Sequence, residues 1–323
     1  MKKKNESSEQ LNIQLFLLCM LAALLCRRLG KISSLRIICG MLRTMIYVGV
    51  YIGWGISIYK RVIQKSVRNV LIFIAELIIF WFVVRTTKYF FTMDNQIARY
   101  LWYSYYIPML FIPVAVLQAA FFLGKSEEYR LPKWLKGVYI PTAVLVLLVL
   151  SNDLHQLVFS FPVGSAWSDS HYTYGWGYYV VLIWEVVCAL TAFVLMIYKC
   201  RHSQKKKYLP LFGIGAAVLY AVLFISGVAW VQEIGGDITA VLCLFFVGIL
   251  ESCVRCGLIQ TNTGYDQLFE VCTLGAQITD QNYNVCYASA NAMPLSKKTM
   301  KDAVEKDVVI DKKTRIQNRT IRG

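Results

Sequence analysis

The residues best suited to chemistry gather between Ser151 and Gly177, a segment without Lys or Arg. Carboxylates and aromatic ring faces without a competing cation suit a cationic or amphipathic ligand. Tyr and Trp also form the aromatic belt of a membrane–water interface, and this alternative stays open. A weaker alternative is that Asp153 and His155, two positions apart, orient a metal ion. The candidate ligand-binding residues are Asp153, His155, Trp167, Asp169, His171, Tyr172, Tyr174 and Trp176.

Two further carboxyl groups lie inside apolar segments, Glu76 in FIAELIIF and Glu185 in LIWEVVC. An ionisable group in lipid is costly and usually faces the bundle interior or water. We therefore predict that both are buried carboxyls. They would contact a ligand, couple a proton, or hold helices together by hydrogen bonds to Tyr103, Tyr105 or Tyr106.

The elements that position these groups are membrane helices. The chain is 57% hydrophobic and 16% charged with a mean hydropathy of +0.50, which indicates a membrane protein. A short apolar run, Leu11 to Cys26, is either a first span or an interfacial helix. Seven further apolar segments are predicted spans, and the fourth should begin earlier, near Trp134, to reach the required length. They are Ile37–Tyr59, Val70–Phe91, Leu101–Leu123, Gly137–Ser151, Tyr178–Tyr198, Tyr208–Val231 and Ile238–Cys253. Pro108, Pro113 and Pro141 should kink their helices.

The net charge of +15 does not indicate nucleic-acid binding, because most Lys and Arg lie in short runs between apolar segments, where they set the orientation in the membrane. Thirteen Lys and Arg lie in three alternate connections, 60–69, 124–136 and 199–207. The connections between them are poor in basic residues, so the positive-inside rule predicts a cytoplasmic C-terminus. Arg27, Arg28, Lys31 and Arg36 disagree with this rule and leave seven or eight spans open.

The fold class predicted is an all-α polytopic membrane bundle of seven transmembrane helices, or eight, with a short α+β cytoplasmic tail. We expect an N-terminal segment over 1–36, a membrane domain over 37–256 and a tail over 257–323. The sequence of the tail predicts strands at 275–279 and 285–288 around a turn at 280–282. It also predicts a helix from Ser296 to Val304, with Ser296 as its N-cap.

The chain resembles the N-terminal seven-helix sensor region of bacterial sensor histidine kinases. The stretches that carry the resemblance include LWYSYYIPMLFIP, YRLPKWLK, VLSNDLHQLVFSFP, YTYGWGYYVVLIWEVVCA and ILESCVRCGLIQTNTGYDQLFE. The following TLGAQITDQNYNVCYASANA is similar to the first strand pair of a PAS-type domain, whose inter-strand turn would begin at Asp280. The resemblance implies a membrane sensor of a two-component system that signals through its last helix. It further implies a homodimer and a kinase core that acts in cis or in trans.

The chain departs from full-length kinases of this kind after the PAS-like start. The tail has no His and no Gly-rich phosphate loop, so we expect no autokinase activity and no cofactor or metal from these residues. The predicted signal junction comprises Glu251, Gly264 and Asp280. The alternatives are a membrane transporter and a structural membrane subunit that docks a separate kinase.

Overall fold

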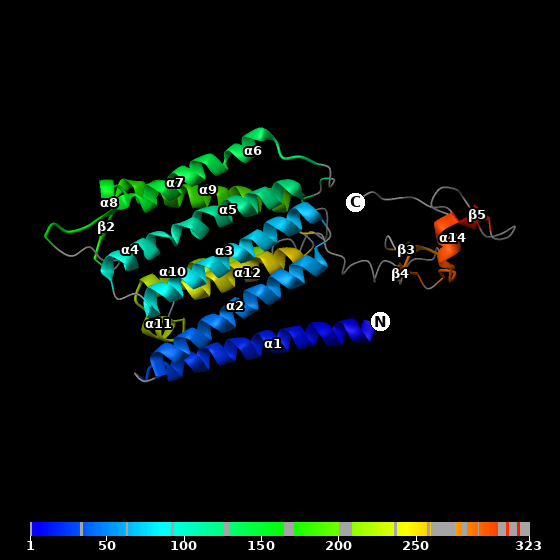
Figure 1. The fold of residues 1–323 in the computed structure, drawn as a ribbon, viewed down its shortest axis with the longest axis horizontal. Coiled ribbons are helices and arrows are strands. Elements are labelled where there is room, and N and C mark those ends of the chain that lie inside the picture. Colours follow the sequence, from blue (N-terminus) through cyan, green and yellow to red (C-terminus); the bar gives the residue numbers. More distant parts are fainter. Residues whose placement is uncertain are drawn as a thin grey trace. The chain divides into compact units, whose positions relative to one another are not determined.

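The computed structural model describes two units, which divide between Gln260 and Thr261. The described residues are 2–32, 35–62, 64–91, 94–123, 125, 129–164, 171–199, 209–235, 238–256, 259, 275–279, 283–289, 291–302, 308–309 and 315–316. The first unit is a helical bundle, and the second holds two short antiparallel strand pairs and a helix (Figure 1).

The helices of the first unit run alongside one another, and two short strands lie at one end, between α8 and α9 in the chain (Figure 1). The helices are α1 (Lys2–Leu29), α2 (Arg36–Arg61), α3 (Lys65–Phe90), α4 (Asn95–Tyr103), α5 (Tyr106–Phe122), α6 (Lys133–Gly137), α7 (Tyr139–Leu150), α8 (Asn152–His155), α9 (Trp176–Lys199), α10 (Leu209–Ile225), α11 (Ala229–Gly235) and α12 (Ile238–Arg255). The strands are β1 (Phe159–Ser160) and β2 (Thr173–Tyr174).

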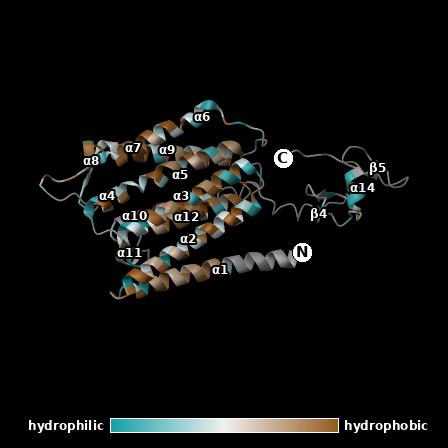
Figure 2. Ribbon diagram, viewed as in Figure 1, coloured by the Kyte–Doolittle hydropathy of each residue, from teal (hydrophilic) through white to brown (hydrophobic). Residues whose placement is uncertain are grey.

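The bundle has the surface of a membrane protein. Six helices of the described chain are long and apolar enough to cross a membrane, and Pro210–Phe224 is a shorter apolar helix. Figure 2 shows largely brown, hydrophobic ribbons through the bundle, and many large apolar side chains of these helices are exposed. On α7, for example, Ile140, Val144 and Leu147 are 57% to 69% exposed and share one face. Water would not favour such a face, whereas lipid does.

The three prolines predicted to kink helices all lie within helices. Pro108 and Pro141 each lie in the first turn of a helix, α5 and α7, where a missing N–H is tolerated. Pro113 stays inside α5. The predicted segment Tyr208–Val231 is wrong as one helix, because the chain turns at Gly227 (φ +77°) between α10 and α11.

The first helix is longer than its apolar run predicts. It begins at Lys2, and α1 lies along α2 (Figure 1). The ring of Phe90 at the end of α3 lies against Gly40 of α2, since a Cβ on Gly40 would lie 2.0 Å from that ring. Only glycine fits this position of α2 without a shift of that ring.

The second unit contains the strands and the helix that the tail predicts. Strands β3 (Gln277–Thr279) and β4 (Val285–Ala288) pair antiparallel, and β5 (Val308–Val309) pairs with β6 (Arg315–Ile316). Helix α14 (Lys297–Asp302) begins after Ser296, whose Oγ accepts a hydrogen bond from Thr299 N at 3.1 Å. The N-cap prediction is confirmed. The turn 280–282 lies outside the described residues.

Candidate functional site

The candidate ligand residues lie in a cap that closes one end of the bundle between α7 and α9. Its described parts are residues 151–164 and 171–177, and β1 pairs antiparallel with β2 inside it. The return of the chain to α9 is tight, because a Cβ on Gly175 would lie 2.1 Å from the backbone oxygen of Leu157. The backbone nitrogen of Gly175 donates to Val158 O at 2.9 Å.

Asn152 organises this cap from a fully buried position. Its side-chain oxygen accepts hydrogen bonds from the backbone nitrogens of Val158 and Phe159, each at 3.0 Å. Its amide nitrogen donates to Phe159 O at 2.9 Å and to the Tyr103 hydroxyl at 3.2 Å. Every polar group of the side chain therefore has a partner, as burial requires.

Asp153 already holds a cation from the chain itself. Arg99 of α4 donates from Nη2 to Oδ2 at 2.6 Å and from Nε to Oδ1 at 3.0 Å, and the Tyr103 hydroxyl donates to Oδ1 at 2.8 Å. The two charged side chains are only 7% and 12% exposed. The expectation of a carboxylate without a competing cation does not hold for Asp153, because folding brings in Arg99 from 54 residues earlier.

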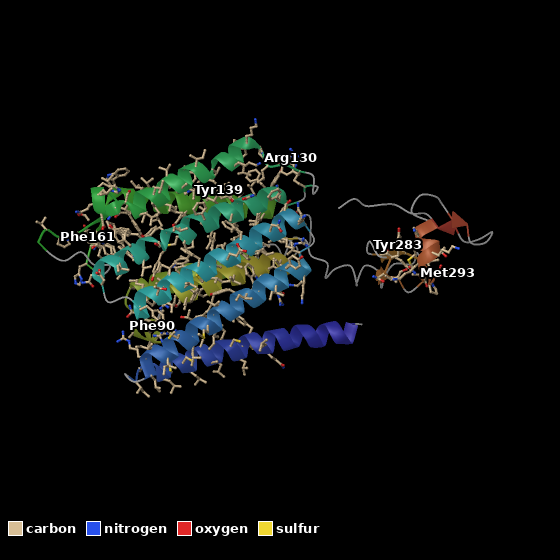
Figure 3. The ribbon with its side chains drawn as sticks, viewed as in Figure 1. Phe90, Arg130, Tyr139, Phe161, Tyr283 and Met293 are labelled. Carbon is tan, nitrogen blue, oxygen red and sulfur yellow. The ribbon has the colours of Figure 1, made fainter. Side chains whose placement is uncertain are left out.

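The electrostatics of Asp153 follow from this pairing. Burial acts to raise the pKa of this carboxyl, but the hydrogen bonds from Arg99 and Tyr103 and the charge of Arg99 outweigh it. The net result is a pKa below the ordinary value. Arg99 also lies over the ring of Phe161, with 5.8 Å from Cζ to the centroid. Phe161 lies at this end of the bundle (Figure 3).

His155 is bound to the backbone through both ring nitrogens. Nδ1 accepts a hydrogen bond from Leu157 N at 3.0 Å, so Nε2 carries the proton and donates to Leu148 O at 3.1 Å. This arrangement fixes the turn after α8 and leaves neither nitrogen for a metal ion. Within the described residues no group of three or more His, Cys, Asp or Glu is placed to hold a metal.

The aromatic residues of the cap pack on one another around Phe159, which is fully buried. The centroid of its ring lies 4.5 Å from that of Trp102, 5.1 Å from Tyr172 and 5.7 Å from Tyr106. Tyr174 stacks on Tyr178 at 4.1 Å. These contacts make a hydrophobic cluster that joins the cap to α4, α5 and α9.

The remaining candidate residues of the cap divide by exposure. Tyr172 is half-buried, whereas His171, Tyr174 and Trp176 are exposed. Trp167 and Asp169 lie outside the described residues. The structure therefore brings Asp153 and Tyr172 against α4, through Tyr103 and Trp102, and Tyr174 against Tyr172. It binds His155 to the backbone instead.

The two intramembrane carboxyls differ from each other. Glu76 is exposed, so the prediction that it is buried is wrong. It shares an outward face of α3 with Phe73, Phe80 and Val83, because the buried residues of this helix lie on other faces. Glu185 is half-buried on α9, and its Oε1 is shielded from solvent with no hydrogen-bond partner among the described residues.

Glu251 near the end of α12 forms the second candidate site. Arg61 at the end of α2 binds both of its carboxylate oxygens, Nη1 to Oε1 at 2.8 Å and Nη2 to Oε2 at 2.7 Å. Trp54 Nε1 donates to Oε2 at 3.3 Å, and Arg255, one turn later on α12, donates to Oε1 at 3.1 Å. Gly264 and Asp280, the other predicted junction residues, lie outside the described residues.

Sequence reasoning missed three residues of these sites, Arg99, Asn152 and Arg61. One signal was available for the first, since Asp94 is the N-cap of α4 and Arg99 then shares a face with Tyr103 at i and i+4. Arg61 and Asn152 carry no such local signal. Their partners are defined only when α12 lies beside α2 and when the cap closes.

Comparison with protein families gives one match. Residues 35–254 match the family described as the N-terminal 7TM region of histidine kinase. The matched segment begins just before α2 and ends within α12, and it leaves α1 outside. No curated protein and no solved structure matched the chain.

Proposed function

Because this multi-pass membrane chain belongs to the family of N-terminal 7TM regions of histidine kinases, we propose that it is the membrane input module of a two-component signalling system. A ligand or a membrane state shifts the bundle between two arrangements, and the last helix carries the change to a cytoplasmic output. The shift requires differential binding to the two arrangements, so ligand affinity and helix position are linked.

The observation that supports this proposal is the ion pair between Glu251 and Arg61. It ties the last membrane helix to α2 four residues before the end of α12. Arg255 offers the same carboxylate a second partner on α12 itself. When α12 moves away from α2, Glu251 therefore keeps one positive partner. The pair defines a docked position, and the intrahelical partner lowers the free energy of the released one.

The orientation belongs to the same proposal. The basic connections and the C-terminus lie in the cytoplasm. Residues 35–254 form seven spans, a number that the description of the matched family supports, with Pro210–Phe224 as the short one beside the six longer helices. We add α1 as an eighth span, because it lies along α2 rather than across the bundle end (Figure 1). Arg27 and Arg28 then lie outside, where they contact α11: Arg27 donates to Gln232 O at 2.9 Å and Arg28 to Glu233 at 3.3 Å.

The tail and the oligomeric state complete the proposal. The β3–β4 hairpin is the start of a PAS-like segment that relays the position of α12 to a kinase core. The module works as a homodimer, and the outward Glu76 supports this. A carboxyl on a lipid-facing surface costs about 2.5 kcal/mol or more at the middle of a span, and a second copy covering it would relieve that cost.

The test fuses the chain after Gly323 to a dimeric histidine-kinase core and measures autophosphorylation. Glu251→Gln and Arg61→Gln each remove charged hydrogen bonds worth about 1.5 to 3 kcal/mol. We expect both to change basal phosphorylation about tenfold or more, in the same direction. The control is Glu233→Gln, which removes the exposed ion pairs with Arg28 and Lys31 and should leave the signal within about twofold. Unchanged phosphorylation in both junction variants would show that α12 is not the output helix.

A further inference from the structure

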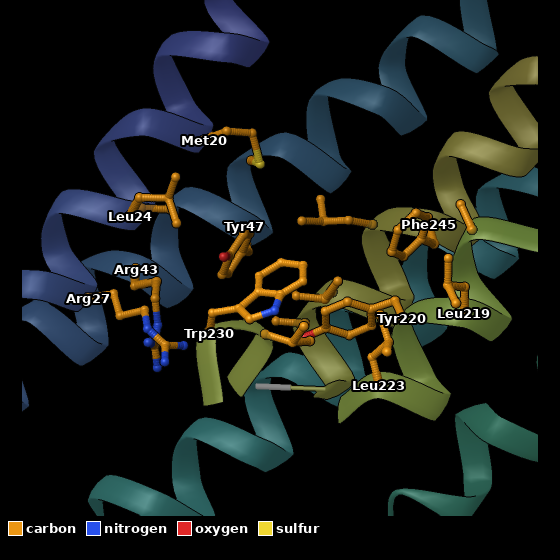
Figure 4. A pocket seen from close by; sticks show the side chains of 16 residues that line it. Met20, Leu24, Arg27, Arg43, Tyr47, Leu219, Tyr220, Leu223, Trp230 and Phe245 are labelled. Carbon is orange, nitrogen blue, oxygen red and sulfur yellow. The ribbon is translucent and has the colours of Figure 1, made fainter. Parts of the chain in front are cut away.

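An apolar cavity of about 440 Å³ lies between α1, α2, α10, α11 and α12. Figure 4 shows it from close by, with Trp230 of α11 pointing into it. Side chains from four other helices form its walls, among them Met20, Leu24, Tyr47, Leu219 and Phe245. Its volume lies within the usual range of about 300 to 1,000 Å³ for a small-molecule site.

A second, polar cavity of about 220 Å³ shares two residues with the first, Arg27 and Arg43. Arg36 and Arg85 complete its four arginines. Figure 4 shows the guanidinium groups of Arg27 and Arg43 beside each other at one edge of the apolar walls. No Asp or Glu occurs among the described residues that line either cavity. An apolar cavity and a strongly cationic one therefore meet at these two arginines.

The depth of these arginines indicates what they bind. A helix of 26 residues such as α2 is about 39 Å long and exceeds a hydrocarbon core of about 30 Å by about 5 Å at each end. Arg43 lies seven residues into α2, about 10 Å along its axis. Its backbone is thus below the edge of the hydrocarbon, and its side chain points back towards the helix N-terminus and the headgroups.

We propose that the two cavities form one site for an anionic phospholipid. The phosphate binds to Arg27, Arg43 and Arg85, since guanidinium groups bind phosphate oxygens in pairs. One acyl chain enters the apolar cavity along α1 and α12. A free phosphate ion would leave the apolar walls unused, and a zwitterionic lipid would bring a further cation among four arginines.

This site has a direct route to the output helix. The apolar cavity is lined by Ala240, Val241, Leu244 and Phe245 of α12, and Glu251 follows two turns after Leu244 on the same helix. A bound acyl chain contacts α12 in the position seen here. The lipid therefore favours that position by the difference between its affinities for the two states. The binding proposal stands without the signalling proposal, because it concerns retention of lipid alone.

The headgroup is tested with the full chain in nanodiscs that contain phosphatidylglycerol or phosphatidylcholine with the same acyl chains. Native mass spectrometry of the released protein counts the retained lipid. We expect phosphatidylglycerol to be retained at least about tenfold over phosphatidylcholine, and the double variant Arg27→Gln/Arg43→Gln to lose this preference. The matched control is Arg28→Gln, which removes the same charge next to Arg27 but lines neither cavity and should behave as the parent.

The acyl chain is tested with a variant that fills the cavity. Ala216→Phe places a ring among the cavity walls. Val218→Phe adds the same ring at a position of α10 where the native side chain is 59% exposed and does not line the cavity. We expect severalfold lower retention of phosphatidylglycerol in the first and no change in the second. Glycerol phosphate, the headgroup without chains, should not displace the lipid.

Three results would overturn the proposal: equal retention of both lipids, equal loss in the Arg28→Gln control, or displacement by glycerol phosphate. Should the double arginine variant fail to fold by size-exclusion chromatography, the paired phenylalanine variants decide alone. Equal retention in Ala216→Phe and Val218→Phe then counts against the site.

Discussion

At the scale of single residues, the cap at the end of α7 shows how the chain satisfies its own charges. Asp153 sits between Arg99 and Tyr103, and both charged groups are nearly excluded from solvent. Removing one partner of such a pair leaves the other charge buried and unpaired, which costs about 3 to 5 kcal/mol. The pair is therefore a determinant of stability, and a cationic ligand would have to displace Arg99 to reach it.

We predict that Asp153→Asn lowers the thermal unfolding midpoint at pH 7 and that this difference shrinks in acid. The pKa of Asp153 in the folded chain is below its ordinary value of 3.8, so its contribution is present above that value and is lost as pH falls through the folded pKa. Unfolding in detergent between pH 7 and pH 3 measures it. An equal difference at both ends of this range would contradict the assignment.

At the scale of elements, hydropathy predicted the helices well because lipid selects for long apolar segments regardless of their partners. It failed where a local feature decides, as at Gly227, where the chain turns between α10 and α11. It also failed to predict that Glu76 faces outward from the bundle. Helix α3 is apolar on almost every face, so its sequence does not tell which face meets the core. Contacts such as Arg61 with Glu251, 190 residues apart, depend on the order in which helices pack.

Gly175 offers a test of the cap as an element. We predict that Gly175→Ala destabilises the chain, because the added Cβ would lie 2.1 Å from the backbone oxygen of Leu157, and backbone cannot rotate away. The control is Gly49→Ala in α2, where a Cβ meets nothing within 4 Å and alanine should stabilise by about 0.5 to 1 kcal/mol. Thermal unfolding of the two variants should shift in opposite directions.

The outward face of α3 gives a prediction for the homodimer. If a second copy covers Glu76, a cysteine placed at Phe80 should cross-link between copies in native membranes under mild oxidation. Cysteine at Val144, which is 57% exposed on α7, is the control and should stay monomeric. Glu76→Leu should weaken the cross-link at position 80, because without the carboxyl this face of α3 can contact lipid at no electrostatic cost. Cross-linking at both positions alike would indicate random collision.

At the scale of the whole molecule, the positions of α2, α12 and α1 set the topology. We predict that alkaline phosphatase fused at Ser34 is active, since it lies outside when α1 spans the membrane. Green fluorescent protein fused at Gly257 should fluoresce, because it lies in the cytoplasm. Phosphatase activity lost at Ser34, with fluorescence retained at Gly257, would put both positions in the cytoplasm, and this outcome would contradict an odd number of spans such as seven between them.

Helix α1 has a consequence for the proposed lipid site. The cavity wall that contains Met20, Leu24 and Arg27 precedes residue 35, where the family match begins. The cavity thus has one part of its wall outside the matched region and the rest inside it. On the lipid-site proposal, substitutions in α1 would change which molecules enter the cavity without altering any residue of the matched region. If the cavity holds a lipid and α12 carries the signal, the residues that select the lipid and those that transmit its presence are therefore open to separate selection within one polypeptide.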